Sequence, residues 1–156
     1  EGNHPPEKHL PAYRLTFGSK VKRDCHAGEW VSPEPAVTYR ERLLRNVRTA
    51  VYALRCHGIG HAIPLADDPE LVDFCIANGV RVAGCPLSNL AGGLIGDVRD
   101  LRIGELIDRG VRYTFRDGSN RELPLIIGLL VVLPEHAVDP AQGFGRPEVR
   151  GKTSSD

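Results

Sequence analysis

The stretch "CHGIGHAIPLADDPELVDFCIANGVRVAGCP", residues 56–86, contains the pattern that decides the fold class. Its first eight residues form a short apolar segment with the composition of a buried strand. A helix is expected next, because Asp67 suits an N-cap, Pro69 suits the first turn and Gly79 suits the C-cap position. The apolar residues at 80–86 then predict a second strand. The stretch therefore predicts one β-α-β unit.

The same alternation continues on both sides of this unit. Before it, "KVKRDCHA" at 20–27 ends in a predicted strand, and residues 39–54 carry apolar side chains at the spacing of an amphipathic helix. After it, "DLRIGELIDRG" at 100–110 predicts a helix and "VRYTF" at 111–115 predicts a strand. Four strands alternating with three helices indicate right-handed β-α-β units and a parallel sheet.

Composition narrows the class of protein. The chain has 156 residues, enough for one domain with a real core, and its 20 basic residues balance its 20 acidic residues. This balance gives no electrostatic support for a nucleic acid or an anionic membrane as partner. The longest apolar run, 123–133, is too short to span a bilayer. We therefore expect neither kind of partner.

The ends of the chain and its cysteines add three expectations. The chain begins with Glu1 and contains no methionine, which suggests a piece of a longer reading frame. Residues 1–133 are expected to fold, and residues 134–156, rich in Pro, Gly and Ser, are expected to be a disordered tail. The four cysteines form no C-x-x-C pair, so we interpret them as reduced core residues of an intracellular, cytoplasmic protein.

Chemically useful side chains follow each predicted strand. In parallel α/β folds the active residues gather at the carboxyl ends of the strands. Such a recurrence at four successive strand ends is hard to ascribe to chance. The residues are His26 and Glu29 after the first strand, His61 after the second, Ser88 and Asn89 after the third, and Asp117 after the fourth.

These residue types suit metal-dependent hydrolysis, but each also has an ordinary explanation. Imidazoles and a carboxylate hold a metal, and a second carboxylic acid moves protons. His26, His61 and Asp117 could supply the first set and Glu29 the second. A single histidine at a strand end is more often a hydrogen-bonded surface residue, Asp117 before Gly118 suits a turn, and Glu29 alone would be a solvated carboxylate. Spacing alone leaves both interpretations open.

Four segments resemble the adenosine deaminase family of metal-dependent amidohydrolases. They are "HAGE" at 26–29, "GIGHA" at 58–62, "LADDPELV" at 65–72 and "CPLSN" at 85–89, in the order and at nearly the intervals of that family. The first residues, "EGNHPPEKHLPAYR", are also similar, so the resemblance covers about residues 1–117. It implies an α/β fold in which this chain forms the C-terminal half of a (β/α)8 TIM-type barrel, with parallel strands alternating with helices.

The resemblance also implies an activity and a role for each residue. The activity is hydrolytic deamination of adenosine, or a related aminopurine, to inosine and ammonia by zinc-activated water. His26 would bind the single zinc ion, Glu29 would donate a proton to the purine ring, and His61 would orient and help to deprotonate the water. Gly2 would contact the purine through its backbone, and Asp117 would match a further zinc ligand. The expected small-molecule partner is a purine nucleoside.

The chain departs from the family pattern in several places. No two of its histidines form the H-x-H pair that provides two zinc ligands in the family. Gly118 stands where the family has a second Asp, which puts purine recognition and the match of Asp117 in doubt. Gly58 replaces the usual arginine. We interpret Ser88 and Asn89 as mainly structural residues that satisfy backbone groups of a turn.

Three hypotheses remain open at this stage. The chain is part of a deaminase whose other ligands lie in a missing N-terminal half, or it is a non-catalytic, degenerate relative without metal. A third possibility is a half-barrel that associates with itself, because an open sheet has unpaired edges and apolar surface. With two ligands absent, we expect the isolated chain to be inactive or nearly so.

Overall fold

The structure, a computed structural model, describes residues 4–30, 36–116 and 122–123. Its sheet has the strand order β1-β2-β3-β4-β5. The first four strands are parallel, as predicted, and β5 pairs antiparallel with β4, which the sequence did not predict. The strands are β1 (Asp24–Ala27), β2 (Gly58–His61), β3 (Arg81–Gly84), β4 (Arg112–Arg116) and β5 (Glu122–Leu123).

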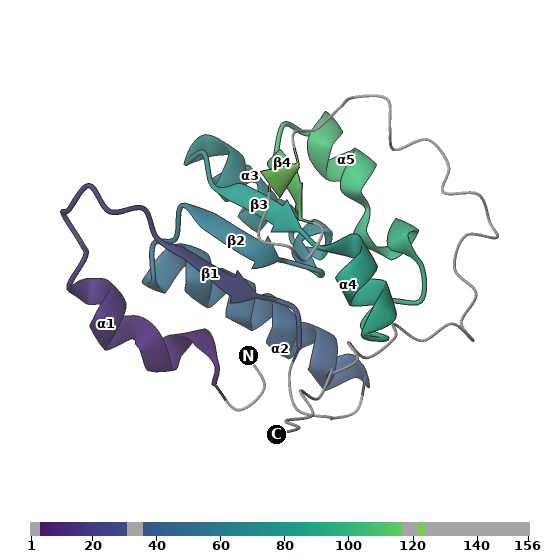
Figure 1. The fold of residues 1–156 in the computed structure, drawn as a ribbon, viewed down its shortest axis with the longest axis horizontal. Helices are drawn as coiled ribbons and strands as arrows, with labels where there is room; N and C mark the ends of the chain where they lie inside the picture. Colours follow the sequence, from purple (N-terminus) through teal and green to yellow (C-terminus); the bar gives the residue numbers. More distant parts are fainter. Residues whose placement is uncertain (1–3, 31–35, 117–121, 124–156) are drawn as a thin grey trace, which may run out of the picture. The chain divides into compact units, whose positions relative to one another are not determined.

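Helical segments precede β1 and connect the parallel strands in turn (Figure 1). The helix predicted between the first two strands is present, and its last turn widens to a π-helix. The α-helices are α1 (Leu10–Arg14), α2 (Ala36–Arg48), α3 (Pro69–Ala77), α4 (Pro86–Ala91) and α5 (Ile103–Asp108). The shorter or irregular turns are η1 (Pro6–His9), η2 (Thr49–Ala53, the π-helical turn), η3 (Leu65–Asp67) and η4 (Val98–Leu101).

The main core lies on one face of the sheet. Because side chains alternate along a strand, every second strand residue faces the helices that connect the strands. A parallel sheet covered by its own crossover helices is the layer arrangement that the sequence predicted. The core joins Ala27, Ile59, Val82 and Tyr113 of the strands to Val47, Leu71, Val72, Ile103 and Leu106 of α2, α3 and α5.

Helix α3 begins one residue later than the sequence prediction. Its N-cap is Asp68, not Asp67, because the Asp68 Oδ1 accepts the Leu71 N–H at 3.1 Å. Arg48 of α2 donates to the other carboxylate oxygen at 2.7 Å. Gly79 follows the helix with φ +63°, as its predicted place at the helix end requires.

The opposite face of β1, β2 and β3 is polar and carries little side-chain bulk on β2. Asp24 and His26 project from β1 on this face, and the Asp24 carboxylate binds the Arg81 guanidinium of β3 at 2.9 Å. This pair spans β2, whose residues between them are glycines. A Cβ at Gly60 would lie 2.6 Å from Cδ2 of His26, so glycine there lets the imidazole lie across β2.

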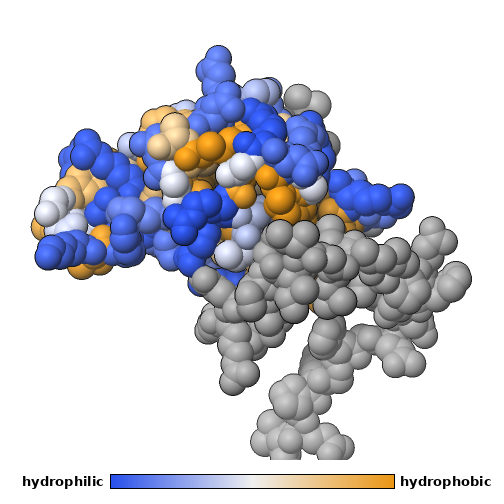
Figure 2. All heavy atoms as spheres, turned by 90° about the horizontal axis from the view of Figure 1, so that it is seen from above, coloured by the Kyte–Doolittle hydropathy of each residue, from blue (hydrophilic) through white to orange (hydrophobic). Residues whose placement is uncertain are grey.

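On the face shown in Figure 2, the described residues are mostly hydrophilic, with hydrophobic residues gathered in smaller areas. No helix in the described ranges is long and apolar enough to cross a membrane. The apolar run at 123–133, the domain boundary at 133 and the tail at 134–156 lie outside the described residues. Among the described residues, the large hydrophobic side chains that are exposed are Leu15, Val21, Trp30, Tyr52 and Leu87.

Candidate active site

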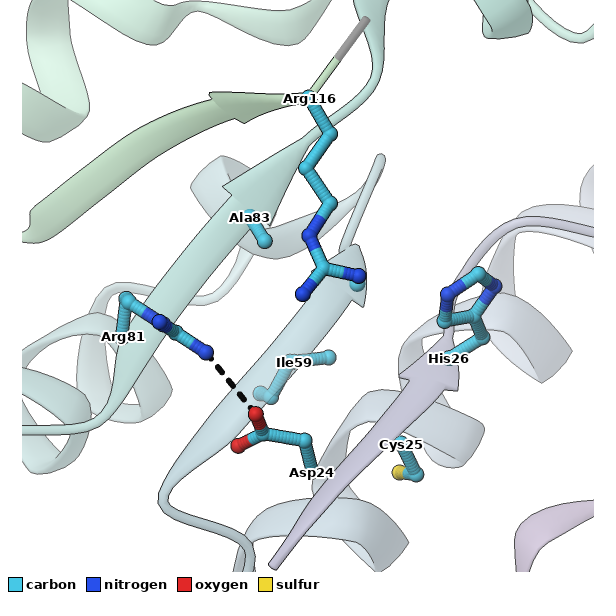
Figure 3. A pocket seen from close by; sticks show the side chains of 8 residues that line it. Asp24, Cys25, His26, Ile59, Arg81, Ala83 and Arg116 are labelled. Atoms are coloured by element: carbon cyan, nitrogen blue, oxygen red, sulfur yellow. Dashed lines mark hydrogen bonds and ion pairs between the residues drawn. The ribbon is translucent and has the colours of Figure 1, made fainter. Parts of the chain in front are cut away.

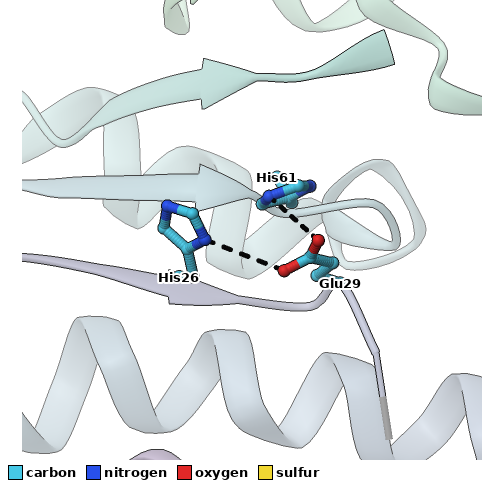
Figure 4. Close-up of side chains that lie close together, drawn as sticks. All are labelled: His26, Glu29 and His61. Atoms are coloured by element: carbon cyan, nitrogen blue, oxygen red, sulfur yellow. Dashed lines mark ion pairs between the residues drawn. The ribbon is translucent and has the colours of Figure 1, made fainter. Parts of the chain in front are cut away.

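The "HAGE" segment turns sharply at the carboxyl end of β1. Gly28 has φ +74°, a conformation that L side chains rarely adopt. A Cβ at this position would also lie 2.5 Å from Cγ2 of Val47 on α2. Glycine is therefore required on two counts, and the turn that it permits brings the Glu29 carboxylate back beside His26 (Figure 4).

His61 ends β2 in a strained backbone conformation. Its φ is +68°, and a non-glycine residue held in this region costs about 1–3 kcal/mol. In the β1–β2 register His61 lies opposite Ala27, so its side chain reaches the end of β1. Only 4% of His61 is exposed. Such strain at a strand end is typical of functional sites, where surrounding contacts hold the residue in place.

His26, Glu29 and His61 form one cluster, with one potential ligand atom of each within 4.8 Å of the others. The His61 Nε2 lies 3.2 Å from Oε1 of Glu29, and the His26 Nδ1 lies 3.7 Å from Oε2. The two imidazole rings meet edge to face, with centroids 4.9 Å apart. Figure 4 shows both rings pointing at the carboxylate from neighbouring strands.

The electrostatics of the cluster favour an ionised Glu29. The His26 imidazole beside the carboxylate is the largest influence and lowers the pKa of the Glu29 carboxyl, and the nearby His61 ring lowers it further. Partial burial acts in the opposite direction and does not reverse the shift. Glu29 is therefore a carboxylate at neutral pH in this arrangement, and it must gain a proton before it can donate one.

Asn89 was named at a strand end, but its contact with His61 was not predicted from the sequence. The expected turn is the short helix α4, and Asn89 on it is fully buried with Oδ1 2.6 Å from Nδ1 of His61. Because an amide oxygen only accepts, the His61 Nδ1 must carry hydrogen, and its Nε2 faces Glu29. Ser88 is exposed. We expected Asn89 to satisfy backbone groups of the turn, whereas its side-chain oxygen contacts His61, and its place after a buried strand was the signal that pointed to the site.

A cavity of about 210 Å³ lies beside the cluster on the polar face of the sheet. Its polar lining comes from Asp24, His26, Arg81 and Arg116. Figure 3 shows the Arg116 guanidinium and the His26 ring on opposite sides of this space. Gly60 also lines the cavity and has no side chain to fill it. His26 is thus shared between the cluster and a space that a small molecule can enter.

The donor atoms of the cluster suit a zinc ion. Two imidazole nitrogens and a carboxylate oxygen are zinc ligands, and catalytic zinc sites combine three protein ligands with an open position. The structure brings together three of the five predicted site residues: His26, Glu29 and His61. The other two, Gly2 and Asp117, lie outside the described residues.

Comparison with known proteins agrees with this geometry. The family model described as adenosine deaminase matches residues 1–150. The chain belongs to the adenosine deaminase family. An adenine deaminase from Stutzerimonas stutzeri is 29% identical over 114 residues, which are 73% of this chain and 33% of that protein. An adenosine deaminase from Salmonella gallinarum is 25% identical over 125 residues, which are 80% of this chain and 33% of the relative.

Two solved structures share the fold of most of this chain. An adenine deaminase from Arthrobacter aurescens superposes with a TM-score of 0.56 at 25% identity, over 72% of this chain and 31% of that protein. An amidohydrolase from Burkholderia ambifaria, solved with bound zinc, gives a TM-score of 0.57 at 23% identity, over 74% and 30% of the two chains. The chain therefore spans about a third of the length of these relatives, and its parallel strands and helices are a segment of their barrel.

Proposed function

We propose that this chain contributes one side of the active site of a hydrolase that removes the amino group of an aminopurine. The observation that carries the proposal is the convergence of His26, Glu29 and His61 at the carboxyl ends of β1 and β2. The relatives named above are adenosine and adenine deaminases, which supports a purine substrate but leaves the nucleoside and the free base as alternatives.

His61 and Glu29 are placed to move the protons of this reaction. With its Nδ1–H given to Asn89, His61 presents Nε2 as the base for a water molecule at the site. Glu29 lies 3.2 Å from that nitrogen, so a proton taken up by His61 can pass to the carboxylate. Glu29 then holds the proton that the purine ring nitrogen accepts, which offsets the charge that develops as the amine leaves.

Zinc is the cofactor that we propose for the cluster. His26 would be its ligand in this chain, with Asp117 as a further candidate. When bound, the metal would lower the pKa of a water molecule at the site toward neutrality. The zinc-containing amidohydrolase of the same fold supports this assignment, as does the donor set of the cluster.

We also propose that the remaining barrel strands cover the outer edge of β1. In the described part of the chain β1 pairs with β2 alone, and the chain spans about a third of its relatives. An open strand edge is a surface that another strand readily joins. Sedimentation of the chain alone distinguishes a second copy from a separate barrel segment, because only a second copy gives a dimer at high concentration.

The function is tested by restoring a complete barrel. This chain is joined to the preceding part of the S. stutzeri adenine deaminase in place of the matching third, and ammonia release from adenine and from adenosine is measured. We expect the hybrid to deaminate at least one of them. Glu29→Gln should lower the rate by about 10²–10⁴-fold, because it removes the proton donor.

Glu70→Gln is the matched control, because this exposed glutamate lies on α3 and outside the cluster. We expect the control hybrid to keep the parent rate. A hybrid that folds, contains zinc and shows no deamination would contradict the proposal. Equal rates for Glu29→Gln and the parent would also contradict it.

A further inference from the structure

Cys25 and Cys56 form a sulfur pair that the deaminase chemistry does not use. The Cys56 thiol donates to the Cys25 sulfur, and the two Sγ atoms lie 3.6 Å apart. Both residues are thiols in this structure. A disulfide bond is about 2 Å long, so the sulfurs need to approach by only about 1.6 Å to bond.

The backbone on both sides holds these sulfurs together. Cys25 lies in the middle of the β1–β2 ladder, opposite Ile59. The Cys56 N–H donates to the carbonyl of Ala50 at 3.0 Å, and the next amide, His57 N–H, donates to the carbonyl of Arg23 at 2.7 Å. The contact therefore joins two anchored segments and does not depend on mobile side chains meeting by chance.

The two thiols differ in their access to solvent. Cys25 is half-buried, whereas Cys56 is 4% exposed, so a dissolved oxidant reaches Cys25 first. The pair lies beside Tyr13 of α1, where burial and the neighbouring sulfurs raise the pKa of the Tyr13 hydroxyl to about 12. The other two cysteines differ: Cys75 is fully buried in α3, and the Cys85 sulfur contacts the carbonyl of Ala83 on β3.

We propose that Cys25 and Cys56 are a modification site that closes to a disulfide when the chain meets a peroxide. The Cys25 sulfur attacks one peroxide oxygen, the O–O bond breaks, and water leaves with the thiol proton, which gives a sulfenic acid. The Cys56 sulfur then attacks the Cys25 sulfur and the S–O bond breaks. A second water carries away the hydroxyl group and the Cys56 proton. Two electrons pass from the thiols to the peroxide.

The bridge would fasten the strand that carries His26. β1 pairs with β2 alone in the described residues, and Cys56 lies two residues before β2 begins. A covalent link here closes a loop that contains α2 and the Glu29 turn, and it restricts the separation of β1 from its neighbour. This inference does not depend on the deaminase proposal, because it concerns the opposite face of β1 from His26.

The test is oxidation of the full chain by a small excess of hydrogen peroxide. Remaining thiols are then alkylated under denaturing conditions, and intact mass and non-reduced peptide maps are recorded. We expect a loss of two hydrogens per chain, one cross-linked peptide that contains Cys25 and Cys56, and alkylation of Cys75 and Cys85. A dithiol reductant should restore four alkylated cysteines.

Cys25→Ser removes the half-buried partner and should abolish the cross-link, whereas Cys85→Ser leaves the pair intact and should retain it. Cys56→Ala provides the same loss if the first variant folds poorly. Over-oxidation of Cys25 to the sulfinic acid without a cross-link would overturn the proposal. It would also be overturned by a bridge between two chains, or by an unchanged mass.

Discussion

Replacement of Asn89 by alanine should disturb His61 through one buried hydrogen bond. Asn89 is 0% exposed and His61 4% exposed, and the bond between them is 2.6 Å long. Loss of the amide leaves the His61 Nδ1–H buried without its acceptor, which costs about 1–3 kcal/mol. We therefore expect Asn89→Ala to lower the free energy of unfolding by about 2 kcal/mol.

A double-mutant cycle isolates this bond from other effects of the substitution. His61→Ala removes both ring nitrogens, and the cost of alanine at positive φ appears equally in the single and double variants. Unfolding in urea is measured for the wild type, Asn89→Ala, His61→Ala and the double variant. We expect a coupling free energy of about 1 kcal/mol or more, since the two side chains are in direct contact.

Ser88→Ala is the matched control, because Ser88 is the exposed neighbour of Asn89 on the same helix. Its free energy of unfolding should change by less than about 0.5 kcal/mol. Additive effects of Asn89→Ala and His61→Ala, within about 0.5 kcal/mol, would refute the argument that Asn89 holds His61 in place.

Three further predictions concern Gly60 of β2, the N-cap of α3 and the dependence of stability on pH. Gly60→Ala should lower the free energy of unfolding by about 1–3 kcal/mol, because the new Cβ would lie 2.6 Å from the neighbouring imidazole carbon. Gly104→Ala, in open space on α5, should raise it by about 0.5–1 kcal/mol. Asp68→Ala should lower the free energy of unfolding by about 1–2 kcal/mol, because Asp68 caps α3. Asp67→Ala should lower it less, because Asp67 makes exposed ion pairs. The reverse order in urea unfolding would contradict the assignment of the cap. Because the pKa of the Glu29 carboxyl is lowered, its carboxylate stabilises the fold above the ordinary carboxyl pKa, and this stabilisation is lost as pH falls through the acid range. The free energy of unfolding of Glu29→Gln should therefore vary less with pH than that of the wild type below about pH 5. Parallel profiles of the two proteins would contradict this.

The sequence predicted the alternation of strands and helices because each signal was local. Apolar segments bounded by glycine and proline predicted four strands in the right order, and the predicted places of Pro69 in the first turn of α3 and of Gly79 after its end were correct. The cap at Asp67 was wrong by one residue, because two adjacent aspartates offer the same side chain. Only the tertiary contact with Arg48 and the amide of Leu71 distinguishes Asp68.

The predicted site residues that the structure brings together have side chains that can bind metal or move protons, and each also follows a predicted strand. His26, Glu29 and His61 were expected from their places at strand ends and from the family resemblance, and the structure brings them together. The contact of Asn89 with His61 was not predicted, because it depends on the distance between α4 and the end of β2, which no local pattern encodes. The positive φ of His61 was not predicted either, because only a few per cent of non-glycine residues adopt it and no local pattern marks them.

The most direct test is a zinc titration of the hybrid barrel, followed by ¹H–¹⁵N NMR through the side chains of the histidines that this chain contributes. We expect the first equivalent of zinc to shift the ring signals of His26 and His61. Those of the exposed His4 and His9 should stay in place, and Glu29→Gln should alter the His26 and His61 signals even before zinc is added. Shifts confined to His4 or His9, with His26 and His61 unchanged, would contradict the claim that the cluster is a metal site.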